Sequence, residues 1–253
     1  ALCPRCNNPV AILGIYKKID VAPHARHAKG INIPYVAQYD EYKFQNCPYH
    51  KKRADYIKEY VPETEEPQRH ELYRITKKHY DKAVYLLQKE TGIYVTLRMA
   101  EALAENYAIM RAYNYIDATI YNIPWFLIYS YNGFPLYHMI IRKNTTLYRH
   151  LRQLGLDLKD SKVKGHAYVE NGEGYVLTAT NYRYVVDGND NLNEWLDFSI
   201  IRPDDTVTDT LLYVPVDRFS VSVDSYHFGN LINYQNWKPR QNVLDIAKRY
   251  MNP

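Results

Sequence analysis

All three cysteines of this 253-residue chain lie within its first fifty residues. Cys3 and Cys6 form a Cys-Pro-Arg-Cys turn, and Cys47 begins a second Cys-Pro sequence. Two thiolates at the first spacing sit at the tip of one tight turn, where both can bind the same tetrahedral ion. A structural zinc site needs four sulfur or nitrogen ligands, so a histidine must supply the fourth. The pattern predicts that a metal site shapes the beginning of the chain.

Two histidines are candidates for the fourth ligand. His27 lies almost midway between Cys6 and Cys47, where it would pin a long loop that chain entropy disfavours leaving loose. His50 completes a Cys-Pro-Tyr-His pair that mirrors the first turn, but it runs directly into the basic residues 51–53. We therefore predict a structural Zn²⁺ ion bound by Cys3, Cys6, His27 and Cys47, with His50 as the alternative fourth ligand.

A disulfide with one spare thiol is the competing interpretation of three cysteines. A redox-active Cys-x-x-Cys pair belongs at the start of a helix in a βαβ context. Asn7, Asn8 and Pro9 follow Cys6 where that helix should begin, which disfavours the redox interpretation. Thiols kept free for metal binding fit a reducing compartment. We expect a cytoplasmic protein, in the host cytoplasm if a phage encodes it.

The chain shows no run of about 18 apolar residues, so no membrane span is expected. The first cysteine turn begins at Cys3, and we expect no leader peptide before it.

Charge and aromatic content point to a polyanionic or protein partner for the basic end of the chain. Residues 1–60 carry ten Lys and Arg against five Asp and Glu, whereas residues 166–253 carry seven against twelve. The chain also holds 27 tyrosines but only 6 phenylalanines, and tyrosine rings suit both interfaces and base stacking. The candidate binding residues for nucleic acid or a partner are Lys17, Lys18, Arg26, Lys29, Lys51, Lys52, Arg53, Tyr35, Tyr39 and Tyr49.

The patterns predict an α+β protein with a zinc-knuckle module over residues 1–61 and an α+β domain over residues 62–253. An acidic, proline-flanked stretch marks this boundary. Within the larger domain the predicted regions are helical over 67–115, mixed over 115–160, β-rich over 162–225 and a terminal helix over 241–251.

Local signals add detail to this outline. Gly92 is a candidate helix C-cap and Thr96 a candidate N-cap, which together predict a pair of helices. The apolar stretch 115–141, with its Asn-Gly pair, predicts two strands or one strand with a buried turn, and residues 145–156 predict a basic amphipathic helix. A further short basic helix is expected over residues 51–60. From residue 162 onward, apolar residues alternate with polar ones, which predicts a mostly antiparallel sheet.

No Gly-rich phosphate loop, nucleophile elbow or His-Glu-x-x-His motif is present. The leading hypothesis is therefore a non-enzymatic, zinc-stabilised binding protein acting on nucleic acid or on a nucleic-acid-processing complex. The amino-acid composition favours residues with AT-rich codons, which suits a phage or mobile-element accessory protein, including an inhibitor of a host defence complex. A protein-binding surface without direct nucleic-acid contact is a third possibility. The enzymatic alternative is a metal-dependent nuclease using carboxylates of the C-terminal sheet, with candidates Asp187, Asp190, Asp197, Asp204, Asp205 and Asp209.

Overall fold

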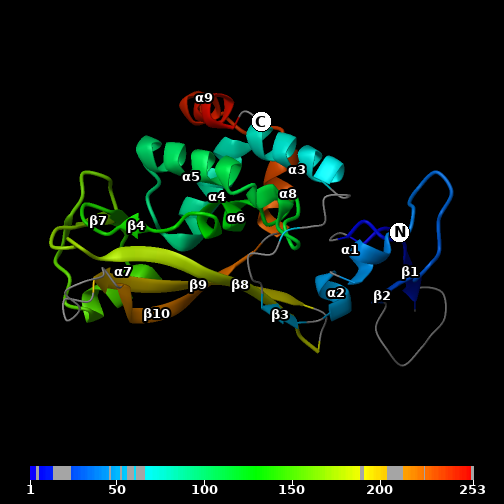
Figure 1. The fold of residues 1–253 in the computed structure, drawn as a ribbon, viewed down its shortest axis with the longest axis horizontal. Helices are drawn as coiled ribbons and strands as arrows, with labels where there is room; N and C mark the ends of the chain where they lie inside the picture. Colours follow the sequence, from blue (N-terminus) through cyan, green and yellow to red (C-terminus); the bar gives the residue numbers. More distant parts are fainter. Residues whose placement is uncertain are drawn as a thin grey trace. The chain divides into compact units, whose positions relative to one another are not determined.

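The computed structural model divides the chain into two compact units, which are described separately (Figure 1). The smaller unit comprises residues 1–54 and 184–193, and the larger unit comprises residues 55–183 and 194–253. The fold is α+β with antiparallel sheets and a C-terminal helix, as predicted. The predicted module boundary at residues 61–62 lies outside the described residues. The described residues are 1–3, 6–13, 24–45, 47–51, 53–55, 60, 66–188, 191–203, 213–224 and 226–251.

The smaller unit consists of short elements. Strands β1 (Val10–Leu13) and β2 (His24–His27) form a two-stranded antiparallel sheet. Helices α1 (Glu41–Gln45) and α2 (Pro48–Lys51) follow, and β3 (Arg53–Asp55) comes next. The prediction of a basic helix over residues 51–60 is wrong. Helix α2 ends at Lys51, and β3 is a strand of the main sheet. Sheet hydrogen bonding overrides a helical pattern this short and weak.

The larger unit carries most of the helices. They are α3 (Glu66–Lys78), α4 (Tyr80–Thr91), α5 (Leu97–Ile109), the 3₁₀ turn η2 (Ala112–Asn114), α6 (Ile123–Tyr129), α7 (Thr146–Gln153), α8 (Tyr226–Asn233) and α9 (Gln241–Tyr250). Figure 1 shows α3, α4, α5 and α9 stacked together above the sheet.

The predicted helix caps are confirmed. Gly92 ends α4 with a φ of 78°, a left-handed conformation that glycine adopts without steric cost. The Thr96 hydroxyl accepts a hydrogen bond from the Met99 amide at 3.2 Å and begins α5. The first helix of the predicted pair is interrupted at His79, which separates α3 from α4. Helix α7 begins after the cap Thr145 and agrees with the predicted basic amphipathic helix.

The two strands predicted over residues 115–141 are only partly correct. Residues Ile123–Tyr129 form helix α6 instead, and the Asn132-Gly133 pair does not join a hairpin. Every residue of α6 is buried, so the segment has no polar face whose spacing could distinguish a helix from a strand. Pro124, near the start of α6, occupies a position that suits a first helical turn. Strands β4 (Phe134–Pro135) and β5 (Ile140–Arg142) follow.

The sheets are antiparallel in every strand pair for which the register is described. The main sheet has the order β10-β9-β8-β3, and β4 also pairs with β8. Its long strands are β8 (Val176–Val186), β9 (Leu192–Pro203) and β10 (Tyr213–Val223). A second sheet has the order β5-β7-β6, with β6 at Leu158–Asp160 and β7 at His166–Val169. Alternate residues are buried within each half of β8, Leu177 and Ala179 before Thr180 and Tyr182, Tyr184 and Val186 after it, which confirms the predicted period of two in each half.

The core of the larger unit is aromatic and aliphatic. Trp125, Tyr107, Leu103 and Phe198 are at most 2% exposed. Large rings of this kind bury more than 150 Å² each and dominate the stability of a core. Among the described residues, no helix is both long and apolar enough to cross a membrane.

Candidate metal centre

The first cysteine turn is a short hairpin closed by the backbone. The Cys3 amide donates to the Asn8 carbonyl at 2.8 Å, and the Asn7 amide donates to the Cys3 carbonyl at 3.0 Å. Asn7 has a φ of 56°, a left-handed conformation that asparagine tolerates better than most residues. The turn places the Cys3 and Cys6 side chains in the interior, where they are 2% and 7% exposed.

The hairpin of β1 and β2 brings a histidine to this turn. The strand register pairs Val10 with His27, so the histidine comes next to the chain that has just left the cysteine turn. The Nε2 atom of His27 lies 3.2 Å from the Cys6 sulfur. The long loop after the first turn is thus folded back by ordinary strand pairing.

The third cysteine stands at the start of a helical turn. Cys47 directly precedes α2, whose first residue is Pro48, and proline is favoured at that position. The His50 amide donates to the Cys47 carbonyl at 2.9 Å, which closes the turn. The Cys47 side chain is 1% exposed, and its sulfur lies 3.7 Å from that of Cys3.

The structure therefore brings together the four side chains predicted as ligands. The four sulfur and nitrogen atoms all lie within 4.8 Å of one another, and three of the four residues are buried. Tetrahedral zinc with bonds of about 2.3 Å to sulfur separates two sulfur ligands by about 3.8 Å. The 3.7 Å between Cys3 and Cys47 agrees with that separation, and a disulfide would require about 2.05 Å. None of the three cysteines takes part in a disulfide.

The electrostatics of the cluster favour a cation at its centre. The hydrogen bond with Cys3 is the first cause that raises the pKa of Cys47, and burial adds to it. The same partner is the first cause that raises the pKa of Cys6. Buried neighbouring thiols resist ionisation because their negative charges would repel one another. A divalent cation reverses that balance because it attracts every thiolate.

Asn8 holds the cysteine cluster through side-chain hydrogen bonds, a role that the sequence patterns did not reveal. Its side chain is 1% exposed, and its Nδ2 atom donates to the Cys6 sulfur at 3.4 Å and to the Asp40 carbonyl at 3.0 Å. Its Oδ1 atom accepts from the Asp40 amide at 2.7 Å. One amide thus orients a sulfur and fixes the loop before α1. The only signal in the sequence is an amide side chain two positions after Cys6.

The alternative ligand His50 lies elsewhere. Among the described residues, the group able to hold a metal comprises Cys3, Cys6, His27 and Cys47 and does not include His50. The His50 ring packs against Phe44 in a tilted arrangement, with centroids 3.9 Å apart. Phe44 is buried, and its edge also meets the His27 ring at 5.4 Å. This phenylalanine separates the two histidines and orients the ligand.

The predicted binding residues fall into three groups. Lys17, Lys18 and Lys52 lie outside the described residues, and the side chains of Lys51 and Arg53 also lie outside them.

Two further lysine and arginine candidates are exposed. Arg26 lies on β2 opposite Ala11, and the Lys29 ammonium lies 4.0 Å from Glu41 and 5.8 Å from the centre of the Phe44 ring.

The three tyrosine candidates differ from one another. Tyr35 is fully exposed, with a φ of 59°. Tyr39 donates to Glu41 at 2.5 Å, and its pKa is raised to about 12, first by desolvation and then by that carboxylate. Tyr49 packs against the cysteine cluster. Of the three rings, Tyr35 is the one most open to a partner.

The carboxylates of the nuclease hypothesis are partly described. Asp190, Asp204, Asp205 and Asp209 lie outside the described residues. Asp187 accepts from the Asn191 amide at 2.9 Å, and Asp197 pairs with Arg183 at 3.0 Å. Both thus have local partners, and the nuclease hypothesis stays a prediction.

The chain matches no protein-family model, no curated protein and no solved structure. The assignment of a function therefore depends on the chemistry of the site.

Proposed function

We propose that Cys3, Cys6, His27 and Cys47 bind one structural zinc ion. The observation that carries the proposal is the convergence of three sulfurs and one imidazole nitrogen within 4.8 Å of one another. Soft thiolates with one imidazole select zinc over magnesium or calcium, which prefer oxygen ligands. Four protein ligands leave no open position for water or substrate, so the ion has a structural and not a catalytic role.

The small core of the unit explains what the ion does. In the described part of the smaller unit, the buried apolar or sulfur-containing side chains are Cys3, Cys6, Val10, Phe44, Cys47, Tyr184 and Val186. Three of these seven side chains are the cysteines themselves. A zinc ion supplies the missing stabilisation, because metal binding to a site absent from the unfolded chain contributes directly to folding.

The zinc-stabilised unit serves as a non-enzymatic binding module, and nucleic acid is the partner that its charge favours. Residues 1–60 carry ten Lys and Arg against five Asp and Glu. Exposed Arg26 and Lys29 supply cations, and the fully exposed Tyr35 ring supplies a surface for base stacking.

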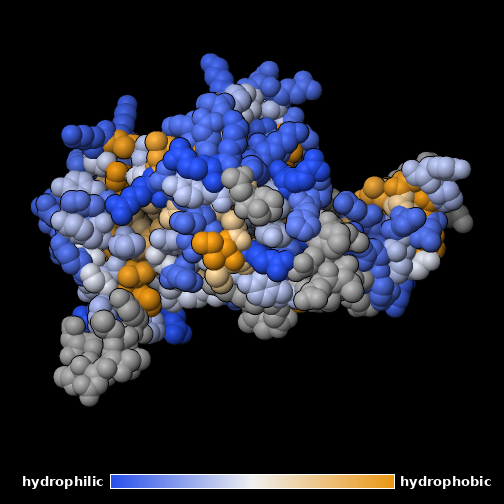
Figure 2. Space-filling model, turned by 45° about the horizontal axis from the view of Figure 1, so that its top comes forward, coloured by the Kyte–Doolittle hydropathy of each residue, from blue (hydrophilic) through white to orange (hydrophobic). Residues whose placement is uncertain are grey.

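A nucleic-acid-processing protein complex is the second candidate partner, and exposed apolar residues favour it. Ile12, Ile31 and Val36 of the smaller unit are 49%, 55% and 57% exposed. Figure 2 shows apolar surface among the hydrophilic residues of this unit, at the right of the view. Exposed apolar groups of this kind are typical of protein docking surfaces.

Elemental analysis of protein purified without chelator tests the metal site. We expect about one zinc per chain in the wild type and in His50→Ala, and almost none in His27→Ala. Replacement of zinc by cobalt should give the absorption of a tetrahedral ion with thiolate ligands. Equal zinc content in both histidine variants would overturn the ligand assignment.

Fluorescence anisotropy with labelled DNA and RNA tests the partner. The Arg26→Glu/Lys29→Glu variant should weaken binding, and the salt dependence of affinity should become shallower. The charge-matched control Arg98→Glu/Lys238→Glu carries its changes on exposed residues of the larger unit and should bind nearly normally. If nucleic acid is not bound, a pull-down comparing wild type with Ile31→Glu/Val36→Glu tests the protein surface, and partners lost only in the variant identify it.

A further inference from the structure

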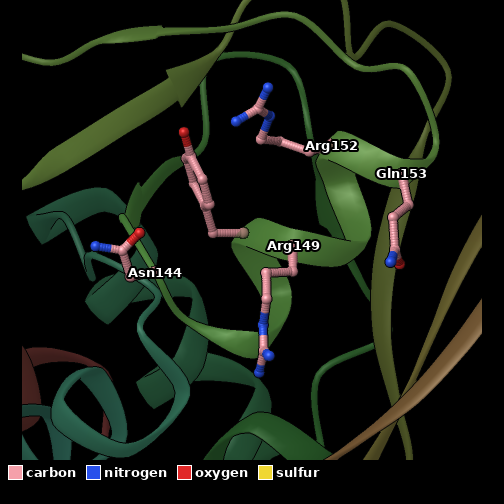
Figure 3. A pocket seen from close by; sticks show the side chains of 5 residues that line it. Asn144, Arg149, Arg152 and Gln153 are labelled. Atoms are coloured by element: carbon pink, nitrogen blue, oxygen red, sulfur yellow. The ribbon is translucent and has the colours of Figure 1, made fainter.

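A hollow on the surface of the larger unit has no role in the metal site. It measures about 440 Å³ and is lined by Asn144, Tyr148, Arg149, Arg152 and Gln153, all on α7 or just before it (Figure 3). Buried Leu147 and Leu151 fix the opposite face of α7, and the helix packs against β5 and β10. The lining residues therefore project from a rigid, well-packed helix.

The hollow carries positive charge and lacks acidic groups. Residues 118–156 contain no Asp or Glu. Two cations near α7 already have partners, since Arg142 donates to the Lys89 carbonyl at 2.7 Å and Lys143 pairs with Asp160 at 2.6 Å. Among the ion pairs between described residues, none involves Arg149 or Arg152. These two guanidinium groups are the charges that remain available to a ligand.

The directions of the two arginine side chains favour a chain of phosphates over a single anion as the ligand. Figure 3 shows Arg149 and Arg152 leaving α7 toward different sides, so their guanidinium groups do not converge on one point. Arg149 makes only a 3.3 Å contact with the Thr146 hydroxyl on its own helix. A lone phosphate would engage one of them, whereas a chain of phosphates can engage both.

The remaining side chains that line the hollow are suited to contact with nucleic-acid bases. Tyr148 is half-buried and offers an aromatic ring beside the arginines, and the amides of Asn144 and Gln153 can donate and accept hydrogen bonds. Arginine forks bind phosphate, and aromatic rings bind unpaired bases in sites for single strands. An acidic peptide would use the positive charge but not the ring.

We infer that this hollow binds single-stranded nucleic acid, with Arg149 and Arg152 on separate phosphates of one strand and Tyr148 against a base. The site lies entirely in the larger unit and does not depend on the zinc ion. It goes beyond the proposed function because it adds a second contact of different construction.

The test uses the full-length protein and a fluorescent oligothymidylate of about 15 nucleotides, near the upper site size of single-strand binding domains. Each phosphate contact on a single strand contributes about 0.7 to the salt slope of log affinity. The Arg149→Ala/Arg152→Ala variant should therefore bind roughly tenfold more weakly, with a slope lower by about 1.4. The matched control is Arg74→Ala/Arg98→Ala, which removes two exposed arginines from α3 and α5 and should bind as the wild type does.

Single substitutions sharpen the result and guard against misfolding. Arg152→Lys keeps the charge but loses the planar fork, and should weaken binding by less than the double variant does. Tyr148→Phe should bind normally because the ring remains, whereas Tyr148→Leu should lose several-fold in affinity. Circular dichroism of each variant checks that α7 is intact.

Several outcomes would overturn the inference. They are equal losses in the double variant and its control, unchanged binding in the double variant, competition by polyglutamate as strong as by oligonucleotide, and competition by inorganic phosphate at the same concentration of phosphate groups. Cys47→Ser separates this site from the proposed function. If that variant loses oligonucleotide binding while the arginine variant keeps it, the zinc unit is the binding module and this inference fails. The reverse result supports the hollow and overturns the binding role of the zinc unit.

Discussion

The described part of the smaller unit buries three candidate cysteine ligands with only four apolar or aromatic side chains, whereas the larger unit buries many tryptophan, tyrosine and leucine side chains. The first arrangement has few apolar groups to remove from water, and the second has many. Burial of apolar area contributes about 25 cal/mol per Å², so we expect the larger unit to depend mainly on that contribution. The comparison predicts two sources of stability in this protein, apolar burial in the larger unit and the proposed zinc ion in the smaller one.

The largest effect is expected when one of the candidate metal ligands is removed. Cys47→Ser should reduce zinc from about one ion per chain to near zero, and residues 1–51 should lose protection from hydrogen exchange. Structural zinc contributes about 10 kcal/mol or more in small domains, which exceeds what the few buried side chains can replace. Mass spectrometry of exchanged peptides should show the larger unit unchanged. Retained protection in residues 1–51 without metal would contradict the comparison.

The converse test damages the apolar core. Trp125 is fully buried in α6, and Trp125→Ala should destabilise the larger unit by about 3–5 kcal/mol through the cavity that it leaves. Its melting temperature should fall by roughly 10 °C, while zinc content stays near one ion per chain. Ile109→Ala is the control, because Ile109 is 69% exposed and its loss should change stability by less than about 0.5 kcal/mol. Loss of zinc in Trp125→Ala would show that the two sources of stability are linked.

A smaller effect, on metal affinity, is expected from substitution of Asn8 beside the candidate metal site. Asn8→Asp keeps the acceptor for the Asp40 amide but loses the Nδ2 donor to both the Cys6 sulfur and the Asp40 carbonyl. Removal of such supporting hydrogen bonds weakens metal affinity by about 10- to 100-fold. Competition with a chromophoric chelator measures this change. An affinity equal to that of the wild type would show that the Asn8 Nδ2 donor does not support the metal site.

The smallest effect concerns pH and the larger unit. Burial, followed by the charges of Lys82 and Lys78, lowers the pKa of His79 below its ordinary value of 6.5. Because the folded pKa is depressed, the neutral ring contributes stability above pH 6.5 that declines as the pH falls through that value. Thermal melts from pH 8 to pH 5 should show a smaller loss for His79→Gln than for the wild type. Parallel curves for the two proteins would assign the acid sensitivity to other groups.

Much of the larger unit was predictable because its signals are local. Gly92 and Thr96 mark helix ends through backbone conformation and a single side-chain hydrogen bond, and neither depends on distant residues. The alternation within each half of β8 likewise depends on neighbouring residues of the strand. Helix α6 was predicted as strand because a segment buried on all sides carries no period.

The candidate metal site was predictable in chemistry but not in geometry. The sequence identifies three thiols and two histidines that could complete the set. The choice between His27 and His50 depends on the β1–β2 register, which pairs His27 with Val10. Strand β2 was not predicted, because its four residues carry no apolar alternation. Asn8 was missed because its role depends on Asp40, far along the chain.

The sequence by itself determined which chemical groups are available: free thiols in a Cys-x-x-Cys turn, capped helices, an alternating sheet and a basic middle segment without carboxylates. Only the tertiary structure decided which histidine joins the sulfurs, where α6 is helical and which arginines border an open hollow. The physical reason is the distance along the chain over which the deciding interactions act. Caps, turns and side-chain periods are set by neighbours in the chain, whereas ligand geometry and surface hollows are set by strand register and helix packing between distant segments.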